Sequence, residues 1–294
     1  MLQCQGVQEK GRKGETLVAV RPVRESLREY ARGIVGGLIF SIPLLYTMEV
    51  WWAGFQLRSE RILILLGFTF LLLLAYNTYA GVRRDETWAG VAIDSVEELG
   101  LGLLVSAGFL FLLGRIEPGD SWREVVGKVV VEATLVAIGI SIGTSQLGQL
   151  DSDPEEDESS GARPKDFLGV LSLSACGAVV LATNIAPTDE IVVLALENSS
   201  WRLLGMVIVS LLLGVLVMVF SDLLDTDQEP RHSVPVRLVF GSVISYAVAF
   251  VCSAAILFLF GRFDGMAPPA VLAMTVVLSV AASMGAAAGK ILIR

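Results

Sequence analysis

Residues 201–220 read WRLLGMVIVSLLLGVLVMVF, and this stretch decides the fold. Its one charged residue is Arg202, at the very start. Because a helix rises about 1.5 Å per residue, a run of this length crosses the roughly 30 Å hydrocarbon core of a bilayer. Hydrocarbon offers no partner for an unpaired backbone group, so a continuous apolar run of this kind must be helical. The stretch therefore predicts a transmembrane helix.

Similar apolar runs recur along the chain and predict an all-α polytopic membrane protein. The chain is 54% hydrophobic and 18% charged, whereas a soluble domain has about 25% charged residues. A net charge of −8 disfavours nucleic-acid binding. Three cysteines, two of them inside apolar runs, exclude a disulfide scaffold. We expect eight spans, at 30–56, 61–80, 87–114, 122–145, 167–197, 201–220, 236–261 and 267–292.

The distribution of lysine and arginine predicts the orientation. If both termini are cytoplasmic, the cytoplasmic segments hold 15 bases and the outer segments hold six. The positive-inside rule favours this arrangement, which makes 1–29 a cytoplasmic tail and 146–166 an acidic cytoplasmic linker. Four of the five tryptophans then belong to the outer interface and Trp88 to the inner one, as an aromatic belt requires.

Two segments of the chain resemble each other, which predicts an internal repeat. Residues 106–115 (SAGFLFLLGR) match residues 253–262 (SAAILFLFGR) at seven of ten positions, with an offset of 147. Weaker matches, in the same order, occur at offsets of 141 and 146. We therefore expect two four-helix repeats, 30–145 and 167–294. An even number of spans in each gives both the same orientation, and we expect a pseudo-two-fold axis along the membrane normal.

Carboxylates inside the apolar spans are the candidate functional residues, because each costs free energy in hydrocarbon unless it is paired, protonated or hydrated. Asp94, Glu97 and Glu98 occupy positions i, i+3 and i+4 of the third span, so they share one helical face. The others are Glu132 in the fourth span, Glu49 in the first, and Asp189 and Glu190 in the fifth. We expect these acids to lie at different depths in the membrane, as a proton or cation path requires.

Proline precedes the acids of the first and fifth spans. Pro43 and Pro187 each remove a backbone donor, and a helix broken there would expose carbonyl oxygens near Glu49 and Glu190. Further oxygens are available on Thr47, Thr188 and Asn184. Such a set suits hard cations or protons, so we expect Glu49 and Glu190 as candidate metal ligands and Ca²⁺, Na⁺, K⁺ or H⁺ as the bound ion.

Structural roles for the same acids remain open. Glu49 and Glu190 could pair with Arg58, Arg61 or Arg202, and Glu132 could pair with Lys128 four residues earlier on its helix. Near the end of the second span, residues 76–78 (Tyr-Asn-Thr) are expected to be interfacial. The GxxxG spacings at 33–37, 139–143 and 285–289 are typical of close helix packing.

The segments Pro43–Glu49, Asp94-Ser95-Val96-Glu97-Glu98 and Pro187-Thr188-Asp189-Glu190-Ile191 resemble those of an uncharacterised bacterial family of integral membrane proteins. The resemblance covers nearly the whole chain after the tail. It implies a bacterial inner-membrane location and supplies no mechanism, because that family has no established activity.

These observations predict an oligomeric membrane protein that conducts cations, either as an ion channel or as a proton-coupled transporter, with no other cofactor. The alternatives are an exchanger of an organic solute and a non-transporting scaffold or sensor whose acids are structural. The sequence has no phosphate-binding loop, nucleophile elbow or zinc-protease motif, so we do not expect an enzyme.

Overall fold

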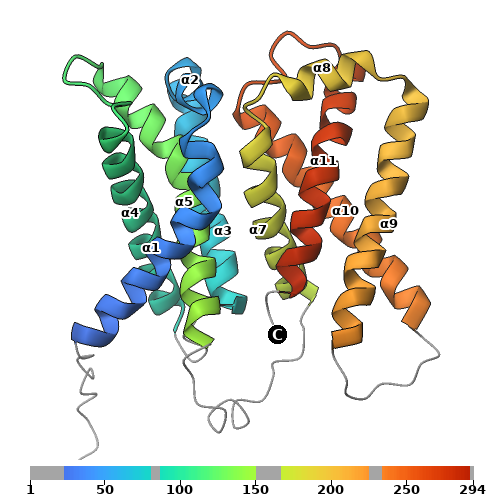
Figure 1. Ribbon diagram of the computed structural model, residues 1–294, viewed down its shortest axis with the longest axis horizontal. Coiled ribbons are helices and arrows are strands. Elements are labelled where there is room, and N and C mark those ends of the chain that lie inside the picture. Colours follow the sequence, from blue (N-terminus) through green and yellow to red (C-terminus); the bar gives the residue numbers. More distant parts are fainter. Residues whose placement is uncertain (1–22, 81–86, 150–166, 225–233, 292–294) are drawn as a thin grey trace, which may run out of the picture.

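The structure is a computed structural model, and it describes residues 23–80, 87–149, 167–224 and 234–291. The described residues form helices and no strands (Figure 1). The first 22 residues of the predicted tail and most of the predicted linker lie outside these ranges. The helices are α1 (Val23–Leu45), α2 (Met48–Gln56), α3 (Ser59–Ala80), α4 (Trp88–Leu112), α5 (Trp122–Gln149), α7 (Phe167–Ile185), α8 (Glu190–Glu197), α9 (Ser200–Leu224), α10 (Val234–Leu259) and α11 (Pro268–Ile291).

Seven of these helices are long and apolar enough to cross a membrane, and α1 with α2 forms an eighth candidate as a bent pair. The spans expected at 30–56 and 167–197 are each interrupted near the proline at which a helix break was expected. Between α1 and α2 the axis turns by 88°, just after Pro43, and α7 ends two residues before Pro187. Proline cannot supply the next helical hydrogen bond and crowds the preceding turn, so the helix ends near it. The remaining residues form the short helices α2 and α8.

Both short helices lie at one end of the bundle, which we call the upper end, and α11 ends at the opposite, lower end together with the start of α1 (Figure 1). Large apolar side chains are exposed along the spans, as lipid-facing helices require. On α9 these include Leu204, Ile208 and Leu212. Exposed tryptophans begin α4 at the lower end and α5 at the upper end, the positions of an aromatic belt.

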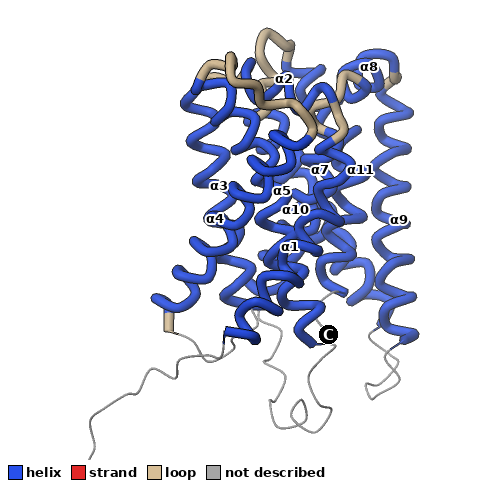
Figure 2. Tube along the Cα trace, turned by 60° about the vertical axis from the view of Figure 1, so that its left-hand side comes forward, coloured by secondary structure: helices blue, strands red, loops and turns tan. Residues whose placement is uncertain are grey.

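The same order of helices occurs twice, as α1 to α5 and as α7 to α11. Most of the described loops between them lie at the upper end (Figure 2). In the first half α5 packs against the other four helices, and in the second half α11 does the same. The helix α5 is the most enclosed span, with 83% of its apolar window buried. Each half is thus built around its last helix.

The matched sequence segments also have matched local structure. At the end of α4, the Gly114 and Arg115 amides donate to the carbonyl oxygens of Phe111 and Leu110. Residues 257–262 make the same two hydrogen bonds at the end of α10. Gly114 and Gly261 have φ values of 66° and 74°, the left-handed conformation of a Schellman helix end, which favours glycine.

Glycine sets the distance between the first and last helix of each half. A Cβ atom on Gly36 of α1 would lie 2.5 Å from the Cα atom of Gly143 on α5. A Cβ atom on Gly177 of α7 would lie 2.1 Å from the carbonyl oxygen of Gly285 on α11. Only hydrogen fits at these crossings, so the backbones touch.

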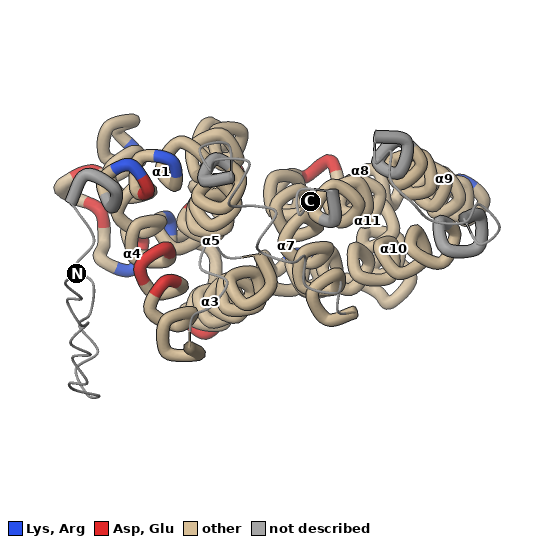
Figure 3. Tube along the Cα trace, turned by 90° about the horizontal axis from the view of Figure 1, so that it is seen from below, with Lys and Arg blue, Asp and Glu red and all other residues tan. Residues whose placement is uncertain are grey.

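The two halves meet through different surfaces. Helix α3 of the first half packs against α7 and α10 of the second, whereas α9, which corresponds to α3, packs against its own neighbours α10 and α11 and lies at the far edge (Figure 3). A two-fold axis would require α9 to pack against α1 and α4. The expected pseudo-two-fold relation is therefore not the one in the structure, and the junction is head-to-tail.

Candidate functional site

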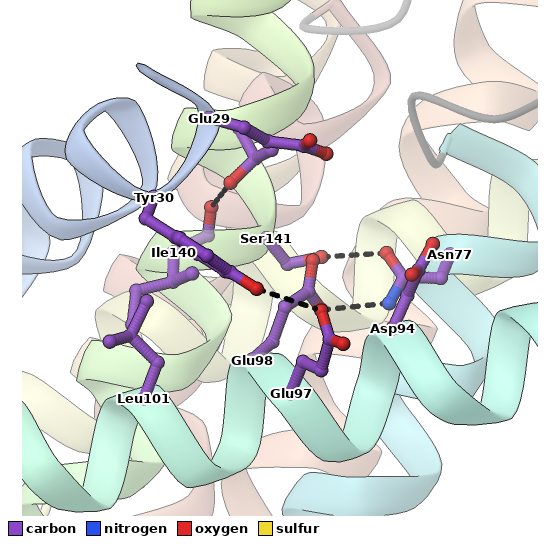
Figure 4. Close-up of a pocket in the computed structure, with 10 residues that line it drawn as sticks. Glu29, Tyr30, Asn77, Asp94, Glu97, Glu98, Leu101, Ile140 and Ser141 are labelled. Carbon is purple, nitrogen blue, oxygen red and sulfur yellow. Dashed lines mark hydrogen bonds between the residues drawn. The ribbon is translucent and has the colours of Figure 1, made fainter. Parts of the chain in front are cut away.

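A cavity of about 190 Å³ opens among α1, α3, α4 and α5 in the lower part of the first half. Its walls contain the three acids of α4 together with polar side chains that come from the other three helices (Figure 4). We call this space the acidic pocket. It is lined by Glu29, Tyr30, Asn77, Asp94, Glu97, Glu98, Leu101, Ile140, Ser141 and Thr144.

Asn77 is the hydrogen-bonding centre of the acidic pocket. Its Nδ2 atom donates to Glu98 Oε2 at 2.7 Å and lies 3.1 Å from Ser95 Oγ. Its Oδ1 atom accepts from the Ser141 hydroxyl at 2.9 Å. The amide is 8% exposed, and it ties α3 to α4 and α5. Figure 4 shows the side chains of Asn77, Glu98 and Ser141 converging.

The acids of α4 differ in their surroundings, although they share one face. Glu98 is half-buried against Asn77, while Glu97 is exposed and lies 3.5 Å from the Tyr30 hydroxyl of α1. Asp94 lies one turn below Glu98, at the pocket wall. The rise of a helix puts Glu98 about 15 Å from the start of α4 at Trp88. The pocket therefore reaches from the lower surface well into the span.

Glu132 is enclosed in the first half, with an exposed fraction of 0%. Neither of its carboxylate oxygens has a hydrogen-bond partner among the described residues. The alternative pairing with Lys128 does not occur: that ammonium group instead donates to the Arg115 carbonyl at 2.8 Å and forms ion pairs with Glu124 at 2.6 Å and Asp120 at 3.2 Å. A buried carboxyl group without a partner is costly, and it marks a candidate functional site.

Two further buried hydroxyl groups lie at the level of Glu132. On α1, Gly33 lies against Ile140 of α5, and Gly37, one turn further, lies against Val136. Because the two helices are antiparallel, one more turn places Ser41 level with Glu132. The Ser41 hydroxyl is fully buried and has no partner among the described residues.

Ser106 reaches the same level from α4. Gly102 meets Ala137 of α5, and one further turn of the antiparallel pair places Ser106 level with Ala133, next to Glu132. The Ser106 hydroxyl is likewise buried and without a partner among the described residues. Three buried polar side chains from α1, α4 and α5 thus share one level of the bundle.

Above Glu132, at the upper end of the first half, Lys128 is ion-paired with Asp120 and Glu124, and we call these three residues the Lys128 cluster. One cation and two carboxylates give it a formal charge of −1. The pKa of Asp120 lies below its usual range because the Glu117 amide and the Lys128 ammonium both donate to its carboxylate. Arg115 lies over the Trp51 ring at 4.6 Å. Lys128 itself lies one helical turn above Glu132 on α5.

Glu49 and Glu190, the expected metal ligands, lie on two different short helices at the upper end (Figure 1). Glu49 is in the first turn of α2, which packs on α5, and Glu190 begins α8, which packs on α11. Asp189 is ion-paired with Arg262 at 2.8 Å. No group of three or more His, Cys, Asp or Glu in the described part of the chain could hold a metal ion. Glu49 and Glu190 belong to short helices in different halves of the protein.

The expected supporting oxygens have local partners near the two helix breaks. The hydroxyl groups of Thr47 and Thr188 donate to the carbonyl groups of Pro43 and Ile185, at the ends of α1 and α7. The Asn184 amide donates to the Val180 carbonyl at 2.7 Å, while its Oδ1 atom is buried with no partner in the described residues. These groups stabilise the helix ends.

Sequence reasoning missed the most connected residue of the acidic pocket. Asn77 was expected at the interface, yet it is buried and bonded to Glu98. Ser141 and Tyr30 were also missed. A signal was present, because an asparagine within an apolar span seeks a polar partner. The partner could not be predicted from the sequence, because Asn77 and Glu98 lie on different helices and helical periodicity relates residues within one helix only.

The second half has no counterpart of this polar set at the corresponding positions. The offsets place Gly241, Ile244 and Ser245 where α4 has its three acids, Met218 in place of Asn77 and Leu278 in place of Glu132. A Cβ atom on Gly241 would lie 2.9 Å from the Met218 sulfur. An apolar contact thus replaces the Asn77 side of the acidic pocket. At these compared positions, the carboxyl groups and the amide occur in the first half alone.

The helical bundle exposes apolar faces along its spans, and seven of its helices are long and apolar enough to cross a membrane. These features define a polytopic α-helical membrane protein. The model of the family described as "Putative integral membrane protein (DUF2391)" matches residues 29–293, and the chain belongs to that family. Comparison with curated proteins found no match, and neither did comparison with solved structures.

Proposed function

We propose that this protein moves protons or small cations across a bacterial inner membrane, through the interior of its first half. The observation that carries the proposal is the pair Glu98 and Glu132. They are carboxyl groups on the adjacent helices α4 and α5, and their equivalents in the other half are a serine and a leucine. Carboxyl groups in a bilayer interior are costly and mark ion paths or proton relays.

The path begins at the acidic pocket, where Asp94 and Glu97 concentrate cations near the lower surface. Orientation by the positive-inside rule makes this the cytoplasmic side. Glu98 then receives the ion or proton from the pocket. Exchange on Glu98 is coupled to the Asn77 amide, because the amide hydrogen bond favours the ionised carboxylate and weakens when a proton or cation binds.

Glu132 forms the middle of the path. Ser141 and Glu132 are nine residues apart on α5, which is about 14 Å along its axis. Gly102 and Ala137 meet in close contact between these levels, so water or a proton reaches Glu132 from the pocket only when α4 and α5 separate. A single unpartnered carboxyl group can carry one proton without other ligands, so a proton is the ion that fits Glu132 best.

The Lys128 cluster governs the upper exit. Its two carboxylates leave the cluster with a formal charge of −1, so protons can pass by way of the carboxylates. This arrangement favours a proton path over a wide cation channel.

A reconstituted flux assay tests the proposal. Purified protein is placed in liposomes that contain a pH-sensitive dye, and a valinomycin-clamped K⁺ potential drives protons inward. We expect dye acidification, with at least a tenfold loss in Glu98→Gln and Glu132→Gln. The control Glu190→Gln, on the other half, should keep the wild-type rate. Parallel assays measure Na⁺, K⁺ and Ca²⁺ flux.

Absence of every flux in folded, monodisperse protein would overturn the proposal. A flux that survives both glutamine variants would move the path elsewhere. The competing function is a membrane scaffold, and it is favoured by one observation: Glu98 already has a hydrogen-bond partner in Asn77. A scaffold would show no flux and would lose stability in Glu98→Gln.

A further inference from the structure

The junction between the halves has a defined chemistry at the upper end. Arg61 of α3 donates through its two Nη atoms to Asp264, in the loop before α11, at 2.7 and 2.6 Å. The same guanidinium lies 5.3 Å from the centre of the Phe258 ring. Gly261 adjoins it, and a Cβ atom there would lie 2.5 Å from Arg61 Nη1. One arginine is thus held by an acid, an aromatic ring and a glycine.

Every member of this set has an equivalent of the same chemistry elsewhere in the chain. The offset of 141 takes Arg61 to Arg202 on α9. The offset of 147 leads back from Asp264, Gly261 and Phe258 to Glu117, Gly114 and Phe111. Gly114 has the same left-handed backbone as its counterpart, with a φ of 66°. The chain therefore holds a second copy of both sides of the junction.

The second copy is unoccupied within one chain. Arg202 and Glu117 are exposed, and neither has an ion-pair partner in the part of the chain that the structure describes. Phe111 is 70% exposed. Helices α9 and α4 lie at opposite edges of the molecule, so these groups cannot meet in one copy (Figure 3).

The apolar surfaces beneath these charges correspond as well. At the junction, the Cys176 thiol of α7 lies 3.7 Å from the Leu72 carbonyl of α3. The equivalent of Cys176 is Val35 on α1, which is 49% exposed. Helix α9, which corresponds to α3, has only 11% of its apolar window buried. Both surfaces of the unused junction thus combine an exposed apolar helix with a charged residue at the upper end, Arg202 on one surface and Glu117 on the other.

We propose that a second copy of this chain occupies the unused junction, with α9 of one copy on α1 and α4 of the next. Arg202 then pairs with Glu117 of the partner subunit, as Arg61 pairs with Asp264 inside each chain. The contact is heterologous, because it joins two different surfaces. Repetition of such a contact closes a ring when its rotation permits. The inference does not rest on ion conduction.

Cysteine cross-linking in membranes tests the proposed contact. In a background without Cys4, Cys176 and Cys252, the paired changes Arg202→Cys and Glu117→Cys should give cross-linked oligomers, and the largest species gives the number of copies in the ring. The pair Arg61→Cys and Asp264→Cys should react within one chain and leave its mass unchanged. The pair Glu197→Cys and Glu117→Cys is the matched negative control.

Charge reversal gives an independent measurement. In detergent and in nanodiscs, Arg202→Glu or Glu117→Arg should lower the association constant by about tenfold, and the double change should restore it. Arg202→Gln, a milder variant, should be intermediate and serves if reversal impairs folding. A monodisperse monomer at all protein concentrations, or oligomers indifferent to both reversals and without the expected cross-link, would overturn the proposal.

Discussion

The Asn77 amide of α3 donates to the Glu98 carboxylate of α4 across 2.7 Å, and it accepts from the Ser141 hydroxyl of α5 across 2.9 Å. One side chain therefore holds three helices around the acidic pocket. The equivalent residue in the second half is Met218, which packs against a glycine. The two halves share a scaffold and differ in the chemistry placed inside it.

Replacement of Asn77 tests this central role. Asn77→Leu leaves Glu98 and Ser141 without their amide partner, and we expect a loss of about 1–3 kcal/mol in the free energy of unfolding. Thr78→Ala is the control, because the Thr78 hydroxyl donates only to a carbonyl of its own helix. Unfolding in a graded denaturing detergent measures both variants. Equal stability of the two would contradict the role given to Asn77.

We expect the Glu132 carboxyl group to lower the stability of the fold while being required for flux. We expect Glu132→Leu to raise the free energy of unfolding by about 1–3 kcal/mol, because it removes a buried polar group that lacks a partner, and to abolish flux. The reverse change in the other half, Leu278→Glu, should lower stability by a similar amount. Thermal unfolding and the liposome assay measure the two effects. A less stable Glu132→Leu variant would show that the carboxyl has a structural partner.

The glycine crossing between α1 and α5 should tolerate no added methyl group. In Gly36→Ala the new Cβ atom would lie 2.5 Å from the Cα atom of Gly143, so the helices must separate. We expect a loss of about 1–3 kcal/mol in the free energy of unfolding. Gly67→Ala on α3 is the matched control, since nothing lies within 4 Å of its added Cβ. Similar melting temperatures for both variants would refute the close crossing.

The junction ion pair should make stability depend on pH. The pKa of Asp264 is lowered, chiefly because Arg61 donates hydrogen bonds to its carboxylate. The pair therefore stabilises the protein fully above the unfolded pKa of about 3.9, and the effect is lost as pH falls through the lower folded pKa.

Because Asp264 is largely exposed, we expect about 1 kcal/mol or less. Unfolding of wild type and Asp264→Asn from about pH 7 to about pH 3 measures the difference in stability. The difference between the two curves should shrink as the pH falls below the unfolded pKa of about 3.9. A difference that does not change with pH would assign it to something other than the charge of Asp264.

The spans and the shared face of the α4 acids follow from the sequence, whereas the continuity of two spans does not. Hydrophobicity predicts one span over 30–56 and one over 167–197, because α2 and α8 are as apolar as the helices before them. The prolines marked where breaks could occur. The 88° turn between α1 and α2 also depends on the packing of α2 against α5.

The partners of charged residues were the least predictable feature. Lys128 and Glu132 are four residues apart and could pair on one helix, yet Lys128 pairs with Glu124 on the turn before it and with Asp120 in the loop before α5. Glu132 has no hydrogen-bond partner among the described residues. A neighbour on the same helix is readable from spacing, while a competing partner from a loop depends on how that loop folds back.

The sequence by itself determined the class of protein, its transmembrane helices and the face shared by Asp94, Glu97 and Glu98, because bilayer thickness and helical periodicity act along one chain segment. The tertiary structure alone decided that Asn77 meets Glu98, that Glu132 has no partner in the described residues and that the halves join head-to-tail. These features depend on the rotation and tilt of one helix against another. Contacts between distant segments set those quantities, with the glycine crossings foremost among them.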